Sequence, residues 1–147
     1  MSTESVRVFR PRWGRWVSEA CAVAVVAAFA YGAAIAPKAF GPVDKAATVA
    51  AGLAVAFVLH RLAAAKVVVR DDGLLVVNPL RSRHVPWWQV RGVRLEPGDA
   101  WLILQLVDNE AVQAMGVQGS DGAYARAQAM DLARIVVSHR DRPPHVR

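Results

Sequence analysis

The sequence lacks the groups on which most enzymes and cross-linked proteins depend. Its 147 residues include one cysteine, Cys21, which excludes an internal disulfide and gives no clue to the redox compartment. It contains no Gly-x-Ser-x-Gly nucleophile turn, no Walker loop and no Gly-x-Gly-x-x-Gly after a strand. The four histidines lack the paired spacing of metal ligands: His60, His84, His139 and His145. These absences favour a protein that is not an enzyme and needs no cofactor or metal.

Charged residues are scarce between residues 16 and 65, where alanine and valine dominate. No residue from Ala20 to Pro37 is formally charged, and with residues 17–19 this run has the length needed to cross a bilayer. Just before it stand residues of the kind that anchor a helix at the lipid headgroups: Arg12, Trp13, Arg15 and Trp16. We therefore predict a transmembrane helix over residues 17–36, with the Glu19 side chain extending to the interface.

A second apolar run, residues 46–65, reaches spanning length only if it includes Arg61, whose long side chain can extend to the interface. The alternative is an interfacial helix or a packed helix of a soluble protein, but a lone helix of this kind would expose apolar surface all round. Residues 37–45 carry two prolines, a glycine and three charges, which indicates a tight turn between antiparallel helices. The sequence thus predicts a transmembrane hairpin over residues 17–65.

The lysines and arginines beside the two helices predict the topology. Four arginines precede the first run, four basic residues lie within or soon after the end of the second, and the turn has two lysines. Cytoplasmic segments carry an excess of Lys and Arg, so both termini are expected in the cytoplasm of a multi-pass cell-membrane protein. Half of the net charge of +6 arises from the arm of residues 1–16. A basic arm beside an apolar helix suggests anionic lipid headgroups rather than nucleic acid.

Two processing signals are disfavoured. Ala34-Ile35-Ala36 is similar to a signal-peptidase site, but Pro37 would follow the cut and the apolar core is long for a signal. Cys21 stands before the apolar stretch, whereas a lipidated cysteine follows one, and Glu19 spoils the small-residue context. We therefore expect the first helix to remain in the protein.

From Lys66 the pattern changes to short β-branched runs separated by turn residues, such as Asp71-Asp72-Gly73. Five or six strands follow, antiparallel because the links are too short for crossovers. Residues 123–139 form the helical pattern of this half, with an apolar stripe at Ala125, Ala129, Leu132 and Val136. Residues 140–147 are interpreted as a polar tail. The order predicts an α+β protein whose domain, residues 66–139, is a small open barrel or bent sheet plugged by the helix.

The series from Val67 to Leu95 resembles bacterial pleckstrin-homology-like (PH-like) domains. The matching features are Asp72-Gly73-Leu74, the stretch Arg83–Trp87 with Val90 after it, and Asp121-Gly122 before the last helix. The series is most similar to the actinobacterial membrane type named after low molecular weight protein antigen 6, in which two transmembrane helices commonly come first. The resemblance covers residues 46–138 and implies a PH-like antiparallel β-barrel of two bent sheets capped by a C-terminal helix. It does not imply phosphoinositide binding, and Trp88-Gln89 departs from the pattern, so no site is carried over there.

Arg81 and Arg83, with Lys66 and Arg70 nearby in the sequence, are the best candidates for contact with a ligand. Basic residues near a membrane attract anionic headgroups, although the stretch Arg81–His84 could also be a solvated loop that follows the positive-inside bias. Trp87 is predicted in the core. Trp88 would face the opposite way on a regular strand, where it either contacts lipid or a partner or packs under a loop.

Paired carboxylates occur at Asp71-Asp72 and within Asp108-Asn109-Glu110. Both groups stand at predicted hairpin tips, where Asp and Asn favour turn geometry, so we assign them to turns rather than to acid–base chemistry.

Two functions fit these features. The first is a non-enzymatic, membrane-anchored interaction module, whose C-terminal domain recruits a protein or contacts membrane lipids at the cytoplasmic face. The second is an accessory subunit of a membrane transporter or complex that acts through its two helices. Small residues that permit close helix packing support the second: Gly32, Ala33, Gly52 and Ala56. The sequence names neither the protein partner nor the oligomeric state.

Overall fold

The computed structural model describes residues 6–140, and the chain divides into two compact units. One unit is a helical hairpin, Trp13–Ala64. The other combines Met1–Arg12 with Ala65–Arg147, so it is built from segments on both sides of the hairpin. The sequence predicted a folded domain from Lys66 onward and missed the contribution of the N-terminal segment. Residues 1–5 of the predicted arm and 141–147 of the predicted tail lie outside the described residues.

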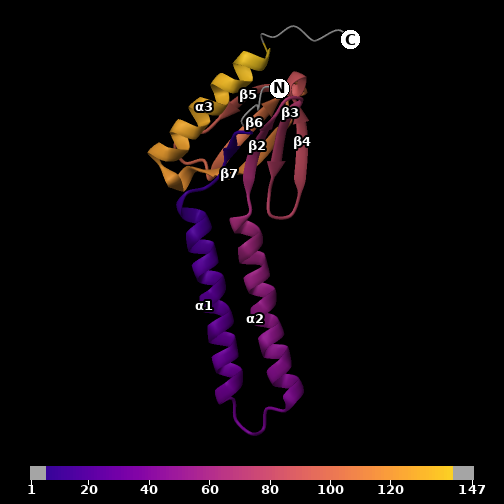
Figure 1. Ribbon diagram of the computed structural model, residues 1–147, viewed down its shortest axis with the longest axis vertical. Coiled ribbons are helices and arrows are strands. Elements are labelled where there is room, and N and C mark those ends of the chain that lie inside the picture. Colours follow the sequence, from indigo (N-terminus) through magenta and orange to yellow (C-terminus); the bar gives the residue numbers. More distant parts are fainter. Residues whose placement is uncertain (1–5, 141–147) are drawn as a thin grey trace. The chain divides into compact units, whose positions relative to one another are not determined.

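The helical unit consists of α1 (Trp13–Ile35) and α2 (Pro42–Ala63), which lie side by side (Figure 1). Both helices are long and apolar enough to cross a membrane, and only 11% of each apolar window is buried. The core helix of a soluble protein is mostly buried, whereas these helices expose large apolar side chains such as Phe57 and Val58. Their composition and exposure together favour association with a membrane.

Both helices begin four residues earlier than the sequence predicted, at Trp13 and Pro42. In α2 the reason lies in the first turn, where proline is tolerated because its missing N–H needs no partner there. The Asp44 carboxylate also accepts a hydrogen bond from the Gly41 N–H at 2.9 Å. The polar residues assigned to the connecting turn therefore form the first turn of the helix.

Two of the contacts between α1 and α2 involve residues of particular interest. Gly52 is buried against Phe29, and a Cβ at this position would lie 2.6 Å from the Phe29 Cβ, so the helices approach closely only because the residue is glycine. Glu19 Oε1 and His60 Nδ1 lie 2.9 Å apart, which gives Glu19 a partner on the neighbouring helix that the sequence did not predict. Gly32 differs from Gly52, because a Cβ there would meet no atom within 4 Å.

The second unit has two antiparallel sheets and one helix (Figure 1). The strands of sheet A, in spatial order, are β1 (Val8–Phe9), β2 (Lys66–Arg70), β3 (Gly73–Val77) and β4 (Ser82–Pro86). Those of sheet B are β5 (Val90–Arg94), β6 (Trp101–Leu106) and β7 (Ala111–Gln118). Helix α3 (Ala123–Arg140) completes the unit. The α+β class, the antiparallel strands and the C-terminal helix agree with the sequence prediction.

Strand β1 is the element that the sequence reading missed. Val8 pairs with Val68 and Phe9 with Val67, and the Val69 N–H donates to the Arg7 carbonyl at 2.9 Å. Phe9 is 6% exposed and belongs to the core. The segment interpreted as a basic arm therefore contains an edge strand of sheet A. A strand of two residues is too short to show an alternating pattern in the sequence.

The core of this unit draws on both sheets and on α3. Helix α3 contributes Ala125, Leu132 and Val136, and Ala129 and Ile135 pack at its margin, as the predicted stripe required. Gln128 is the one buried polar residue of α3 among those described. The largest fully buried side chains from the strands are Leu74, Leu102, Leu104, Leu106, Val67, Val76, Val85, Val90 and Val117.

Within residues 6–140 the two sheets keep separate hydrogen-bonded ladders and do not close, so the predicted PH-like β-barrel is not confirmed. Asn78, at the end of β3, connects them. Its side-chain amide donates to the Gln113 carbonyl at 2.7 Å, and its oxygen accepts from the Met115 N–H at 3.0 Å. Nearby on β7, a Cβ at Gly116 would lie 2.5 Å from the Lys66 Cα, which shows how closely β7 approaches β2.

Two local expectations differ from the structure. Ser82–His84, for which a solvated loop was one alternative, belong to β4, where they pair with residues 75–77 of β3. Trp87–Gln89 form a 3-10 turn instead of continuing a strand, and the Val90 N–H bonds back to the Trp87 carbonyl.

Candidate functional site

The register of sheet A places Arg81 at one end of the sheet. Lys66 pairs with Val77, and Val77 pairs with Ser82, so the β3–β4 turn lies beside the first residue of β2. We call this the Lys66 end of sheet A. Arg81 is exposed in that turn, and its neighbour Leu80 is 93% exposed. The pairing of Phe9 with Val67 brings the residues after β1, including Arg10, toward the same end.

Arg83 is in a different situation. It is the second residue of β4, opposite Val76, and its guanidinium donates to the Glu110 carboxylate at 2.9 Å. The two side chains are 45% and 57% exposed, so the ion pair adds little stability. The pair nevertheless gives Arg83 a carboxylate partner within the protein. Arg83 therefore connects β4 to the β6–β7 turn and is not a free cation.

Trp88 lies at the opposite end of sheet A from Arg81. It follows Pro86, which pairs with Gly73 at the β2–β3 turn, and it is 72% exposed. The structure therefore does not bring Arg81, Arg83 and Trp88 into one site. Arg70, the fourth basic candidate, pairs with Gly73 at the same end as Trp88.

Trp87 is half-buried against the core, next to exposed Trp88. Its indole N–H donates to the Arg70 and Asp71 carbonyls at 3.2 and 2.9 Å. Its ring stacks on the His139 ring with centroids 4.1 Å apart. Trp87 thus fixes the β2–β3 turn to the end of α3, and of these two tryptophans Trp88 is the one that can contact another molecule.

The paired carboxylates take part in turn geometry. Asp108 Oδ1 accepts from the Glu110 N–H at 3.0 Å, and Asn109 between them has a φ of 63°, which asparagine tolerates. Asp72 Oδ1 lies 3.2 Å from His84 Nε2 on the adjacent strand. Within residues 6–140, no group of three or more His, Cys, Asp or Glu side chains could hold a metal ion.

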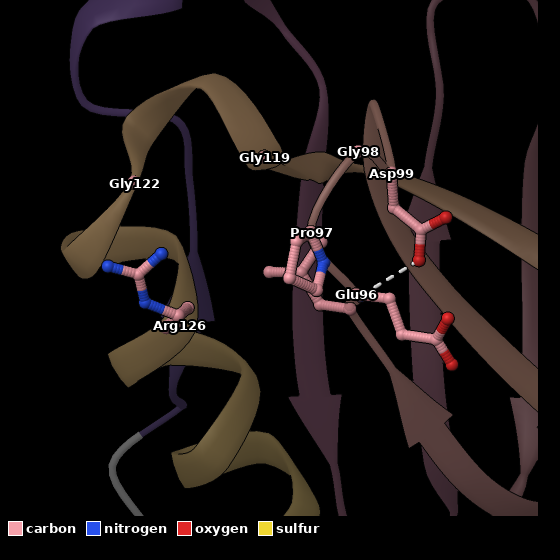
Figure 2. Close-up of a pocket in the computed structure, with 8 residues that line it drawn as sticks. Glu96, Pro97, Gly98, Asp99, Gly119, Gly122 and Arg126 are labelled. Carbon is pink, nitrogen blue, oxygen red and sulfur yellow. Dashed lines mark hydrogen bonds between the residues drawn. The ribbon is translucent and has the colours of Figure 1, made fainter.

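A shallow depression of about 200 Å³ lies between the turn of residues 95–99 and the start of α3 (Figure 2). Its acidic residues already have partners: Asp99 accepts from the Glu96 N–H at 2.9 Å, and Arg94 lies 3.8 Å from Asp99 and 4.0 Å from Glu96. Figure 2 shows both carboxylates pointing away from Arg126 on α3. The depression thus presents one exposed arginine and glycine backbone, which is a weak basis for a ligand site.

A larger groove, of about 400 Å³, lies between β1 and α3. Gln128 forms part of its lining, and its Nε2 donates to the Arg10 carbonyl at 3.2 Å. The Gln128 Oε1 atom is buried without a hydrogen-bond partner among the described residues. Sequence reasoning missed this groove because one of its walls, β1, was not predicted. The sequence did offer one sign of the groove, namely a polar residue, Gln128, directly beside Ala129 of the predicted apolar stripe.

Comparison with known proteins now adds the family. Residues 64–135 match the family described as Bacterial PH domain. The chain belongs to this family. Three uncharacterized mycobacterial proteins are also similar, among them Rv1417 of Mycobacterium tuberculosis and Mb1452 of Mycobacterium bovis. Each is 32% identical over 136 residues, which cover 89% of this chain and 88% of the relative. No solved structure matches the chain.

The family match confirms the resemblance seen in the sequence, and it also shows which elements the matched segment contains. The matched segment begins at residue 64, so it contains β2 to β7 and most of α3 but not β1. The similarity to the mycobacterial relatives is longer than the matched segment and extends into the helical hairpin. The relatives therefore share more with this chain than the PH domain alone.

Proposed function

We propose that the protein is a membrane-anchored PH domain that acts as a non-enzymatic interaction module at the cytoplasmic face of the cell membrane. One observation carries the proposal: β1 and β2, which stand on either side of the two apolar helices in the sequence, pair in one sheet. A domain built in this way cannot separate from the hairpin without losing a strand. The hairpin thus serves as a built-in anchor for the PH domain.

The same pairing supports the proposed topology. If α1 and α2 span the bilayer, β1 precedes the first crossing and β2 follows the second, so both must be on the same side for Phe9 to pair with Val67. Only the short turn between the helices would then lie outside. The excess of arginine before α1 and after α2 favours the cytoplasm for the PH domain.

The separation of Arg81 from Trp88 supports different partners for the two residues. Lys66 comes three residues after the last residue of α2, so the Lys66 Cα stays within about 11 Å of that residue. The β3–β4 turn lies beside Lys66 in the sheet. There, Leu80 and Arg81 form an exposed apolar and basic pair suited to anionic headgroups. Trp88, at the other end of the sheet, is suited to a protein contact, because exposed tryptophans often anchor interfaces.

The second candidate is an accessory subunit that acts through the helices. Gly32 favours it, because this small residue is exposed and could let another helix approach closely. Gly52 does not favour it, because Phe29 of the same hairpin already packs against this glycine.

Site-specific photo-crosslinking in native membranes distinguishes the two candidates. A photoreactive residue is placed at Trp88, in the PH domain, or at Phe57, on the exposed surface of α2. An interaction module gives a specific protein adduct from Trp88 and lipid adducts from Phe57. An accessory subunit gives protein adducts from Phe57 alone, and the absence of a specific protein adduct from both positions contradicts both functions.

A hairpin replacement provides the second arm. Residues 13–64 are exchanged for an unrelated two-helix anchor, so that β1 and β2 keep their connection to a hairpin. If the PH domain carries the function, the Trp88 adduct is retained. Loss of the adduct in a folded replacement protein argues instead for the helices.

A further inference from the structure

We infer that the groove between β1 and α3 binds a short extended segment of a partner protein, in which an apolar residue stands beside acidic residues. The inference rests on the proposed function and adds a second surface for a protein partner to the one at Trp88. The groove is separate from Arg81, Arg83 and Trp88, and none of its lining residues was singled out by the sequence as a site.

The groove offers an apolar floor of suitable size. Its volume is about 400 Å³, and its lining includes Val8, Phe9, Ala127 and Met130. Met130 is 57% exposed and Val8 38% exposed, so both present apolar surface that nothing in the described chain covers. Methionine adapts its shape to different partners, which suits a binding surface. One apolar side chain of the partner can therefore be buried here.

The backbone of β1 is available for pairing on this side. The Arg7 carbonyl accepts from the Val69 N–H, so Arg7 and Phe9 direct their backbone groups toward β2. Val8, between them, directs its N–H and C=O away from β2, because antiparallel strands alternate in this way. Among the described residues no strand pairs with that edge, so an extended segment could do so, as in strand addition to a sheet.

Gln128 provides a second hydrogen-bonding group. Its Nε2 bonds to the Arg10 carbonyl, which continues the outward edge of β1, but its Oε1 has no partner among the described residues. Gln128 is 9% exposed, so this oxygen is deprived of water as well as of a protein donor. A small rotation of the amide, for which the terminal torsion is soft, would turn Oε1 toward a backbone N–H of a segment in the groove.

The charges around the groove favour an acidic partner. Arg134 belongs to the lining, Arg7 flanks β1, and the Arg12 guanidinium lies 5.7 Å from the centre of the Tyr124 ring. Among the described residues, two acids contact these three arginines. Asp121 already accepts the Arg12 N–H, and Asp131 is shared between Arg7 at 3.9 Å and Arg134 at 3.7 Å. Those exposed pairs are weak, so acidic residues of a partner can compete for both arginines.

Selection from a peptide library tests the inference. Random heptapeptides displayed on phage are selected against the full chain in phosphatidylcholine nanodiscs, with empty nanodiscs as the subtraction step. We expect enriched sequences that place an aliphatic or aromatic residue next to Asp or Glu. Affinities of the enriched peptides are then measured by fluorescence anisotropy.

Two substitutions distinguish the groove from the rest of the surface. Ala127→Trp fills the groove from an exposed position, and Arg134→Glu reverses a charge on its rim, so each should weaken peptide binding about tenfold. The matched control is Val137→Trp, which adds the same side chain to an exposed position of α3 outside the groove and should leave binding unchanged. Thermal unfolding of each variant confirms that the fold is retained.

Other outcomes overturn the inference and separate it from the proposed function. Enrichment of basic peptides, or peptides whose binding survives both substitutions, excludes the groove as the site. If Arg134→Glu weakens only the binding of phosphatidylglycerol vesicles and no peptide is enriched, the groove contacts lipid instead. A protein adduct from Trp88 together with either result leaves the interaction module intact and rejects only this groove.

Discussion

Phe9 and Val67 are cross-strand partners in sheet A, although both long helices lie between them in the sequence. In the sequence, the helical hairpin is therefore inserted between the first and second strands of the sheet. The hairpin and the PH domain are joined by two chain connections rather than one.

Removing the Phe9 ring should destabilise the PH domain. Phe9→Ala deletes a side chain that is 6% exposed, and the free energy of unfolding should fall by about 3 kcal/mol. The measurement is hydrogen exchange of the β2 amides in detergent micelles. Val8→Ala, at a position 38% exposed in the same strand, is the control and should cost less than about 1 kcal/mol. Equal protection in the two variants would show that β1 is dispensable.

Asn78 should be required for the connection between the sheets. Asn78→Ala removes the donor to Gln113 and the acceptor for Met115, at a cost of about 1–3 kcal/mol. Exchange of the Met115 amide should accelerate most. Asn109→Gly also removes a side-chain amide, but at a positive-φ position that glycine adopts readily, so Met115 should keep its protection in that variant. Unchanged exchange of the Met115 amide in Asn78→Ala would contradict the assignment.

Two glycines in the hairpin should respond in opposite ways to the same substitution. Gly52→Ala forces a Cβ to within 2.6 Å of the Phe29 Cβ, and such overpacking should cost about 1–3 kcal/mol. Gly32→Ala meets no atom within 4 Å and should stabilise α1 by up to about 1 kcal/mol. Thermal unfolding in detergent measures both effects. Adding Phe29→Ala to Gly52→Ala should recover part of the loss, and the absence of recovery would mean that the contact with Phe29 is not the cause.

Leu80 and Trp88 should report different surroundings in a membrane. Each is replaced by cysteine in a Cys21→Ser background and labelled with an environment-sensitive fluorophore. Emission from the label at residue 80 should shift to the blue in vesicles with anionic lipid, and Arg81→Glu should reduce the shift, because each cation near the surface contributes about 1 kcal/mol. The label at residue 88, at the other end of sheet A, should show no such shift. Identical spectra at both positions would reject the proposed lipid contact.

Several features could be read directly from the residues. The apolar runs, the β-branched strands and the stripe on α3 each occupy enough residues for their periodicity to be recognised, and the structure has helices and strands at these places. The loose PH-like motif around Asp72-Gly73-Leu74 was sufficient to identify the family. The placement of the candidate site was not predictable in the same way. Whether Arg81 and Trp88 share a surface depends on the register of β3 and β4, which no single segment specifies.

The sequence by itself determined which segments are apolar enough for a membrane and which form strands, because these properties depend on neighbouring residues. Only the tertiary structure decided that Val8 and Phe9 join a sheet whose other strands follow the hairpin. The same holds for the pairing of Arg83 with Glu110 and for the groove between β1 and α3. Each of these arises from contacts between residues far apart in the chain, and the pattern of neighbouring residues does not specify such contacts.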